Sequence, residues 1–76
     1  MKVPPKHSPF LATLTRVPRN GSPRRWRDAE GTRIYEWDAL HGELEVYNGK
    51  GRHLGAVDPN TGVLLKQPKK GRRIDV

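Results

Sequence analysis

The sequence predicts an all-β protein, an antiparallel β-meander preceded by a short N-terminal helix. Two observations predict this fold. From residue 24 onward, segments rich in β-branched and aromatic residues are separated by short runs of Gly, Asn, Asp and Pro. Connections this short usually join antiparallel neighbours. The chain has 76 residues, so we expect a single domain or a fragment of a larger protein.

The composition of the chain changes near residue 24. Five of the seven prolines lie before this point, and residues 20–23 (Asn-Gly-Ser-Pro) have the composition of a flexible joint. We therefore expect a proline-rich N-terminal arm over residues 1–23 and a functional domain over residues 24–76.

The arm contains the pattern of one short helix. Ser8 followed by Pro9 is typical of a helix start, with an N-cap and a proline at the first helical position. Apolar residues then recur at helical spacing up to Val17, and Pro18 ends the pattern. Because two helical turns are not stable alone, this helix either docks on the rest of the chain or is disordered when free.

Four strands are expected after residue 24. Residues 43–47 (Glu-Leu-Glu-Val-Tyr) alternate polar and apolar side chains, and Gly42 ends the turn before them. Residues 48–51 have the composition of a hairpin loop, and residues 58–62 that of a turn. The basic run at residues 66–73 is either a solvated tail or the last edge of the sheet. The expected strands cover residues 32–38, 43–47, 52–58 and 63–66.

The chain is strongly basic. Fifteen Lys and Arg residues oppose eight Asp and Glu residues, and the net charge of +7 favours a polyanion partner, nucleic acid first. The lack of cysteine excludes disulfides and thiolate zinc sites. No run approaches the roughly 20 apolar residues of a membrane span. Residues 1–6 lack the apolar stretch of a secretory signal, and we expect a soluble monomer.

Half of the acidic residues are gathered in one short stretch. Glu36, Asp38, Glu43 and Glu45 are four of the eight. If residues 39–42 form a turn, Asp38 lies opposite Glu43 and Glu36 opposite Glu45, which places all four carboxylates on one face. We expect His41 at the rim of this face. The opposite, core-facing side then carries Tyr35, Trp37, Leu44 and Val46.

Two interpretations of this acidic face remain open. In the first, the carboxylates form a solvated surface, paired with Arg33 or Arg52. In the second, a histidine and a carboxylate act on RNA, whose 2′-hydroxyl is an internal nucleophile. Cleavage then needs a base, an acid and a cation, which Glu, His and Arg supply without a metal. Crowding of like charges would raise the pKa of one carboxylate toward a useful range.

The remaining histidines and one tryptophan have alternative interpretations. His7 lies in the arm and is interpreted as incidental, whereas His53 lies in a strand and is assigned a core or sheet-surface position before a catalytic one. The histidines lack ligand spacing, so we expect no metal site and no cofactor. Trp26, flanked by arginines, is either a platform for stacked bases or a core side chain.

Several stretches of the sequence together resemble a known family. They are Arg25-Trp26, residues 31–38 (Gly-Thr-Arg-Ile-Tyr-Glu-Trp-Asp) and residues 41–45 (His-Gly-Glu-Leu-Glu). These stretches resemble the cytotoxic ribonuclease domain of the ribosome-inactivating colicins, a module also found in related pyocins and contact-dependent inhibition toxins. The resemblance covers about residues 24–74 and does not extend to the arm. Residues 53–55, 58–62 and 65–66 continue the match in order.

The resemblance implies a fold, an activity and partners. The fold is a strongly twisted antiparallel sheet. The activity is a single endonucleolytic cut in 16S ribosomal RNA of the small subunit, at the decoding site, which blocks translation. The partners are this ribosomal RNA and an acidic cognate immunity protein. The domain is expected within a secreted or surface-delivered toxin that acts in the cytoplasm of the target bacterium.

The family's catalytic Asp, His and Glu fall on Asp38, His41 and Glu45, and its C-terminal arginine falls on Arg72. With the chemistry above, Glu45 is the base for the 2′-hydroxyl and His41 the acid for the 5′-oxygen. Asp38 orients His41, and Arg72 stabilises the phosphorane. The products are a 2′,3′-cyclic phosphate and a 5′-hydroxyl. Exchange of the roles of Glu45 and His41 stays open.

Basic residues outside this catalytic set are expected to bind RNA. The expected RNA-binding residues are Arg24, Arg25, Trp26, Arg27, Lys66, Lys69, Lys70 and Arg73.

The alternative function is a non-catalytic, basic RNA-binding β-module, which explains the charge but gives no reason for the acidic cluster.

Overall fold

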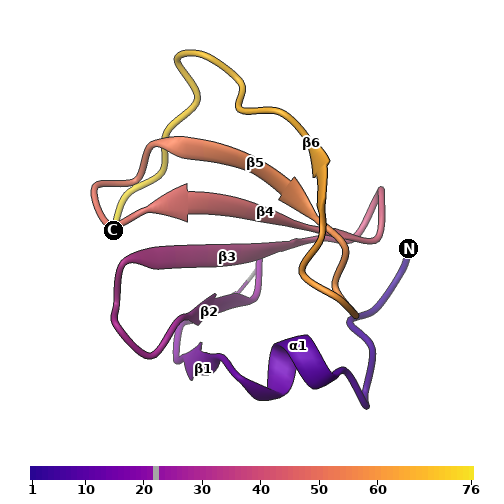
Figure 1. Cartoon of the computed structure of the whole chain (residues 1–76). Coiled ribbons are helices and arrows are strands. Elements are labelled where there is room, and N and C mark those ends of the chain that lie inside the picture. Colours follow the sequence, from indigo (N-terminus) through magenta and orange to yellow (C-terminus); the bar gives the residue numbers. More distant parts are fainter. Residues whose placement is uncertain (22) are drawn as a thin grey trace.

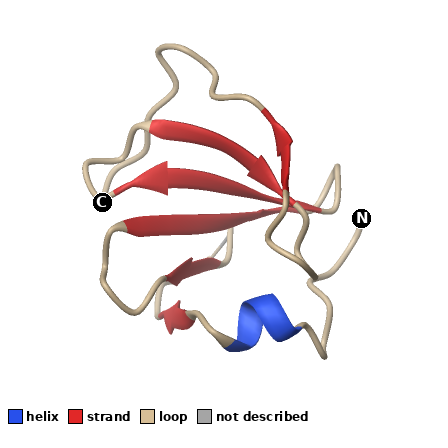
Figure 2. Cartoon of the chain, viewed as in Figure 1, coloured by secondary structure: helices blue, strands red, loops and turns tan. Residues whose placement is uncertain are grey.

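The computed structural model describes residues 1–21 and 23–76 as one antiparallel sheet with a single turn of helix (Figures 1 and 2). The six strands follow one another in chain order across the sheet, so the predicted all-β meander is confirmed. The joint predicted over residues 20–23 includes Ser22, which lies outside the described residues. The elements are α1 (Pro9–Ala12), β1 (Thr15–Val17), β2 (Arg25–Arg27), β3 (Arg33–Asp38), β4 (Glu43–Asn48), β5 (His53–Val57) and β6 (Leu64–Lys66).

The pairing of β3 with β4 determines which side chains share a face. Glu36 is paired with Glu45 and Asp38 with Glu43, as the sequence predicts. Because side chains alternate along a strand, the residues between them point to the other face. The predicted separation into a carboxylate face and an apolar face is therefore confirmed.

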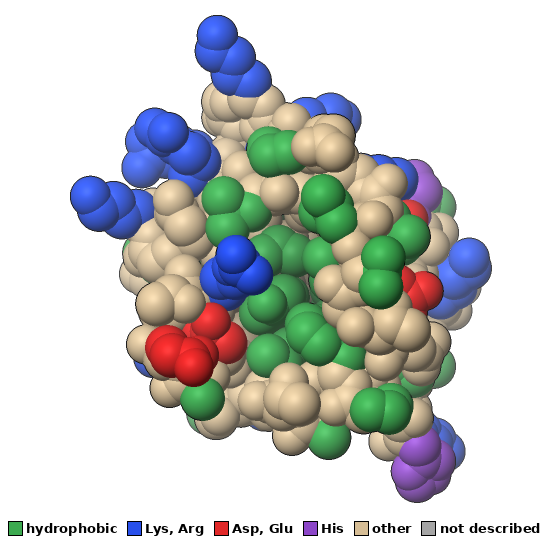
Figure 3. Space-filling model, in the orientation of Figure 1, with side chains coloured by type: hydrophobic (Ala, Val, Ile, Leu, Met, Phe, Trp, Pro, Cys, Tyr) green, Lys and Arg blue, Asp and Glu red, His purple; other side chains and the backbone are tan. Residues whose placement is uncertain are grey.

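The apolar face of the sheet forms the core. Phe10 of α1 packs edge-on against Tyr35, with ring centroids 5.5 Å apart, and α1 thereby covers part of this face. Viewed as in Figure 1, hydrophobic side chains gather in the middle of the molecule and most of the visible Lys and Arg side chains project from its rim (Figure 3). The buried cluster comprises Trp26, Tyr35, Trp37, Leu44, Val46 and Val57.

The N-terminal helix is shorter than the spacing of apolar residues predicts. Ser8 caps it as expected, because its Oγ accepts the N–H of Leu11 at 3.0 Å. The Ser8 hydroxyl also donates to the carbonyl of Pro59 at 2.6 Å, which docks the helix on the turn after β5. The prediction that the helix reaches Val17 is wrong. Val17 lies in β1, paired with Arg25 of β2, because β-branched residues favour a strand where a partner edge is available.

The C-terminal segment after β6 returns to the start of β5. The N–H of His53 donates to the carbonyl of Arg72 at 3.0 Å, and the N–H of Ile74 donates to the carbonyl of Gly51 at 2.9 Å. Residues 72–74 thus lie along the sheet edge and Lys66 lies in β6, whereas residues 67–71 form an exposed connection, so each of the two predicted alternatives holds for part of the basic run. Across residues 1–21 and 23–76 the structure contains no helix long and apolar enough to cross a membrane.

Gly55 allows β5 and β6 to approach closely, and its replacement tests this packing. Its φ is +132°, and a Cβ added there would overlap the carbonyl oxygen of Lys66. We expect Gly55→Ala to lower the free energy of unfolding by about 3 kcal/mol, from backbone strain and overpacking. Gly71→Ala is the matched control, since its φ is +83° with no atom near the added Cβ. It should cost about 1 kcal/mol. Equal destabilisation of the two variants in urea unfolding would contradict this account.

Candidate active site

The turn between β3 and β4 holds His41 against Asp38. Asp38 Oδ1 accepts the N–H groups of Leu40 at 3.0 Å and His41 at 3.1 Å, which fixes the backbone of the turn. Asp38 Oδ2 lies 2.7 Å from Nδ1 of His41. An ionised carboxylate only accepts hydrogen bonds, so Nδ1 carries the proton and donates it. Nε2 of the half-exposed imidazole is therefore the nitrogen left for a substrate.

The Asp38 carboxyl is held in its ionised form. Partial burial raises its pKa, but the hydrogen bonds and charge of His41, with the N–H of Leu40, outweigh burial and leave the pKa below its ordinary value. This is opposite to the upward shift that like-charge crowding predicts. The cause is that the Asp38 oxygens accept three local hydrogen bonds from this turn.

Glu45 lies on the same face and is bracketed by two donors. His53 Nε2 lies 3.2 Å from Oε2, and Arg72 Nη1 lies 3.0 Å from Oε1. His53 Nδ1 accepts the N–H of Lys69 at 2.8 Å, so its ring proton is on Nε2 and is donated to Glu45. Glu45 is thus oriented by one group from β5 and one from the C-terminal segment.

Tyr47 and Arg72 complete this side of the site. The Tyr47 side chain is fully buried, and burial raises the pKa of its hydroxyl. The nearby Arg72 lowers this pKa, whereas the negative charges of Glu36 and Glu45 raise it further. Burial lowers the pKa of Arg72, but Tyr47 and Glu45 outweigh it and raise the pKa above its ordinary value. Arg72 therefore remains a cation beside the Glu45 carboxylate.

The other two carboxylates of the face are also paired with cations. Glu36 Oε2 accepts hydrogen bonds from Arg19 and Arg25, and Lys66 Nζ lies 2.9 Å from Glu43 Oε1. This ion pair raises the pKa of Lys66, although the buried Oε1 of Glu43 receives no hydrogen bond of good geometry. The solvated-surface interpretation paired these carboxylates with Arg33 of β3 or Arg52 of the β4–β5 turn, and the observed partners are different residues.

One group of side chains in the described part of the chain has the spacing of metal ligands. One ligand atom each from Asp38, His41 and Glu43 lies within 4.8 Å of the others. Asp38 and His41 are bonded to each other, and Glu43 is paired with Lys66. Carboxylate and imidazole side chains can bind divalent cations, but here they already have partners within the protein.

The four predicted catalytic residues line one cleft of about 530 Å³. Glu36, Tyr47 and His53 line the same cleft. The sequence patterns did not place Tyr47 or His53 at the site. Tyr47 follows Glu45 by two residues and so shares its face, and the irregularity in β4–β5 register pairs His53 with Tyr47 and brings it to the same face. The predicted catalytic residues that the cleft brings together are Asp38, His41, Glu45 and Arg72.

The predicted RNA-binding residues are divided among several surfaces. Lys66 and Lys69 line the cleft. Trp26 is 8% exposed within the core cluster, with the Arg16 guanidinium 5.3 Å from its ring centroid, which favours its alternative interpretation as a core side chain. The others line neighbouring surface grooves or project into solvent: Arg24, Arg25, Arg27, Lys70 and Arg73.

Comparison with known proteins identifies the family. The family model described as Cytotoxic matches residues 11–75. The chain belongs to this family. The match begins within the N-terminal arm, a segment for which the sequence resemblance gave no counterpart, and it includes β1.

Curated relatives agree with this assignment. Over 55 residues the chain is 51% identical to colicin E3, 49% identical to colicin-E6 and 49% identical to cloacin, all from Escherichia coli. The matched region is 71% of this chain and 10% of each relative. The chain thus corresponds to a small part of each of these larger proteins.

Asp38 gives this member of the family a measurable dependence of stability on pH. Because its pKa is lower in the folded state than the ordinary value of 3.8, it stabilises the fold at neutral pH and loses this effect as pH falls below 3.8. We expect Asp38→Asn to cost about 1 kcal/mol of unfolding free energy at pH 7. The difference from wild type should shrink in acid, where both side chains are uncharged.

Urea unfolding between pH 2 and pH 7 measures this difference. Glu30→Gln, at an exposed acid in the β2–β3 turn, is the control and should follow the wild type at every pH. A penalty for Asp38→Asn that stayed constant down to pH 2 would show that the Asp38 charge is not the cause.

Proposed function

We propose that the chain is the catalytic domain of a bacterial toxin and that it is an endoribonuclease. The observation that carries this proposal is the single cleft in which His41, Glu45 and Arg72 meet within a protein of net charge +7. A non-catalytic RNA-binding surface gives no reason for Glu45 and His41 to share a cleft, whereas RNA cleavage needs a base and an acid. The family assignment and the similarity to two colicins and cloacin support the same conclusion.

The cleft supplies the groups for attack by the RNA's own 2′-hydroxyl. Glu45, as base, takes the 2′-proton, and the 2′-oxygen forms a bond to phosphorus. Arg72, which stays charged beside Glu45, stabilises the extra negative charge on the phosphorane oxygens. His41, as imidazolium, gives a proton to the departing 5′-oxygen as the phosphorus–oxygen bond breaks. The products are a 2′,3′-cyclic phosphate and a 5′-hydroxyl.

Asp38 and His53 hold the two reacting side chains. Asp38 accepts the Nδ1–H of His41 and presents Nε2 outward, and its negative charge stabilises the imidazolium. His53 directs the Glu45 carboxylate through Nε2–H. Because the nucleophile belongs to the RNA, this mechanism requires no metal ion. The reverse assignment, with His41 as base and Glu45 as acid, uses the same contacts and is resolved by the pH dependence below.

The proposed substrate is 16S ribosomal RNA at the decoding site of the small subunit, where one cut blocks translation. The proposed second partner is an acidic immunity protein, which a surface of charge +7 would attract through long-range electrostatics. Both proposals rest on the resemblance to ribosome-inactivating colicins. They place the domain in a delivered toxin that acts in the cytoplasm of the target bacterium.

Incubation with intact ribosomes tests the activity, and incubation with a short RNA of the decoding-site sequence in excess EDTA tests its independence of metal. We expect one new small-subunit RNA fragment. His41→Ala should slow cleavage by about 10² to 10⁴-fold, the usual contribution of a general acid or base, and leave salt-dependent RNA binding nearly unchanged. His7→Ala, in the exposed arm, is the matched control and should cut normally. Binding by wild type without cleavage would favour the RNA-binding module, and cleavage lost only in EDTA would indicate a metal-dependent nuclease.

The pH dependence of cleavage assigns the base. The wild-type rate should pass through a maximum, with an acidic limb where the base becomes protonated. Glu45→Gln should lower the rate and remove that limb, because the amide does not titrate in this range. Survival of the acidic limb in Glu45→Gln would show that Glu45 is not the base and would favour the reverse assignment.

A further inference from the structure

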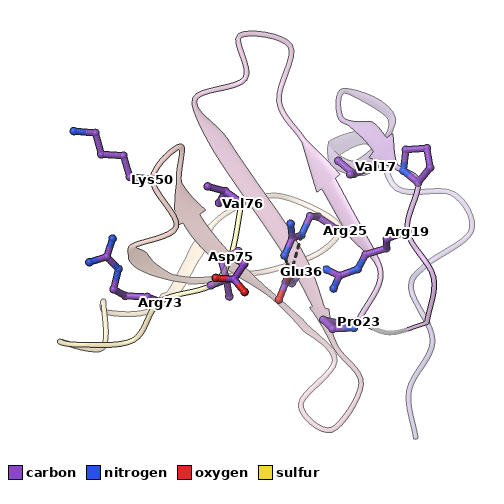
Figure 4. A pocket seen from close by; sticks show the side chains of 11 residues that line it. Val17, Arg19, Pro23, Arg25, Glu36, Lys50, Arg73, Asp75 and Val76 are labelled. Carbon is purple, nitrogen blue, oxygen red and sulfur yellow. Dashed lines mark hydrogen bonds and ion pairs between the residues drawn. The ribbon is translucent and has the colours of Figure 1, made fainter.

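A second, larger groove adjoins the catalytic cleft. Its volume is about 1030 Å³, and it shares Pro23 and Glu36 with the lining of the cleft. It runs between the connection from β1 to β2 and the C-terminal residues (Figure 4). Four cationic side chains and two acidic ones line it: Arg19, Arg25, Lys50, Arg73, Glu36 and Asp75. We call it the basic groove.

Glu36 anchors two guanidinium groups in this groove. Its Oε2 accepts the Nε–H and an Nη2–H of Arg25 at 2.9 and 2.6 Å, and an Nη1–H of Arg19 at 3.0 Å. Glu36 is 8% exposed, so the anchor is buried, whereas the side chains of Arg19 and Arg25 are 31% and 15% exposed. A guanidinium has five N–H donors, and these contacts leave most of them for a ligand. Such fixed donors suit phosphate oxygens.

The other wall presents two more cations. In Figure 4, Lys50 and Arg73 lie on the opposite side of Asp75 from Arg19. The turn that carries Lys50 is fixed, because Asn48 Oδ1 accepts the N–H groups of Lys50 and Arg52, both at 2.9 Å. The exposed Lys50 side chain therefore projects from a defined backbone.

We propose that the basic groove binds the phosphodiester backbone of the RNA strand that flanks the scissile bond. This inference rests on the proposed function, because it takes the RNA chain to pass through the catalytic cleft. A strand whose scissile phosphate lies near Arg72 must leave the cleft, and the groove continues from it at Glu36. An acidic protein would also be attracted to these cations, but continuity with the cleft favours RNA.

Binding of an uncleavable RNA tests the groove without catalysis. The probe is a short single-stranded 2′-O-methyl RNA, which lacks the nucleophile, and the readout is fluorescence anisotropy across a salt series. Removing one cation that binds a phosphate should reduce the slope of log affinity against log salt by about 0.7. We expect that reduction in Lys50→Gln and about twice that in Arg19→Gln/Lys50→Gln. Thermal unfolding of each variant is the control that checks that it is folded.

Lys6→Gln and Arg33→Gln are the matched controls. Each removes an exposed cation outside the groove, and both should keep the wild-type salt slope. Equal slopes for groove variants and wild type, or equal reductions in groove and control variants, would overturn the inference. Tighter wild-type binding to a polyglutamate peptide than to the RNA, with the same dependence on the groove cations, would assign the groove to an acidic protein and also overturn it.

The same variants in ribosome cleavage separate this inference from the proposed function. We expect a raised KM with little change in kcat, because the groove contacts RNA away from the reacting atoms. If wild type binds the 2′-O-methyl RNA through the groove but cuts no RNA, the groove is supported and the proposed nuclease function fails. If ribosomes are cut but the groove cations do not affect the salt slope or KM, the nuclease function stands and the groove inference fails.

Discussion

Two pairs of carboxylates face each other across β3 and β4, and much of the structure serves to accommodate them. Glu36 is opposite Glu45, and Asp38 is opposite Glu43. Like charges in directly opposed positions destabilise a sheet. The chain accommodates them by providing Glu36, Glu43 and Glu45 with a cation or a donor from other segments and Asp38 with donors from the turn that follows it. This arrangement requires segments far apart in sequence to meet on one face.

These partners explain features that the meander alone does not require. The C-terminal segment lies beside the start of β5 and places Arg72 next to Glu45. β6 supplies Lys66 to Glu43, and β2 supplies Arg25 to Glu36. Each of these three cations thus neutralises one carboxylate of the face formed by β3 and β4. The contacts that complete the cleft are therefore also contacts that hold the sheet and the C-terminal segment together.

Local patterns predicted the centre of this site, and distant contacts determined the rest. The alternation in residues 43–47 and the turn before it were enough to place Asp38, His41 and Glu45 on one edge of one face, because register follows from the apolar side. The contact of His53 with Glu45 depends on an irregularity in the β4–β5 ladder that composition does not reveal. Arg19 comes from the arm, and no local pattern connects it with β3.

The wrong prediction that the N-terminal helix reaches Val17 has the same cause, a contact between segments that no local pattern reveals. Apolar spacing in residues 10–17 fits a helix, but the edge of β2 competes for residues 15–17 and the strand is formed. Propensity is a weak preference that such tertiary contacts override. The Ser8 cap was predictable because capping is local, whereas its second bond to Pro59 was not.

The central claim is that Glu45 and His41 catalyse attack by the RNA's own 2′-hydroxyl. The most direct measurement is the chemical identity of the two new ends in ribosomal RNA from treated ribosomes. We predict a 2′,3′-cyclic phosphate on the upstream fragment and a free 5′-hydroxyl on the downstream one. A 3′-hydroxyl with a 5′-phosphate would show that water or another external nucleophile attacked, and it would contradict the assignment of this cleft.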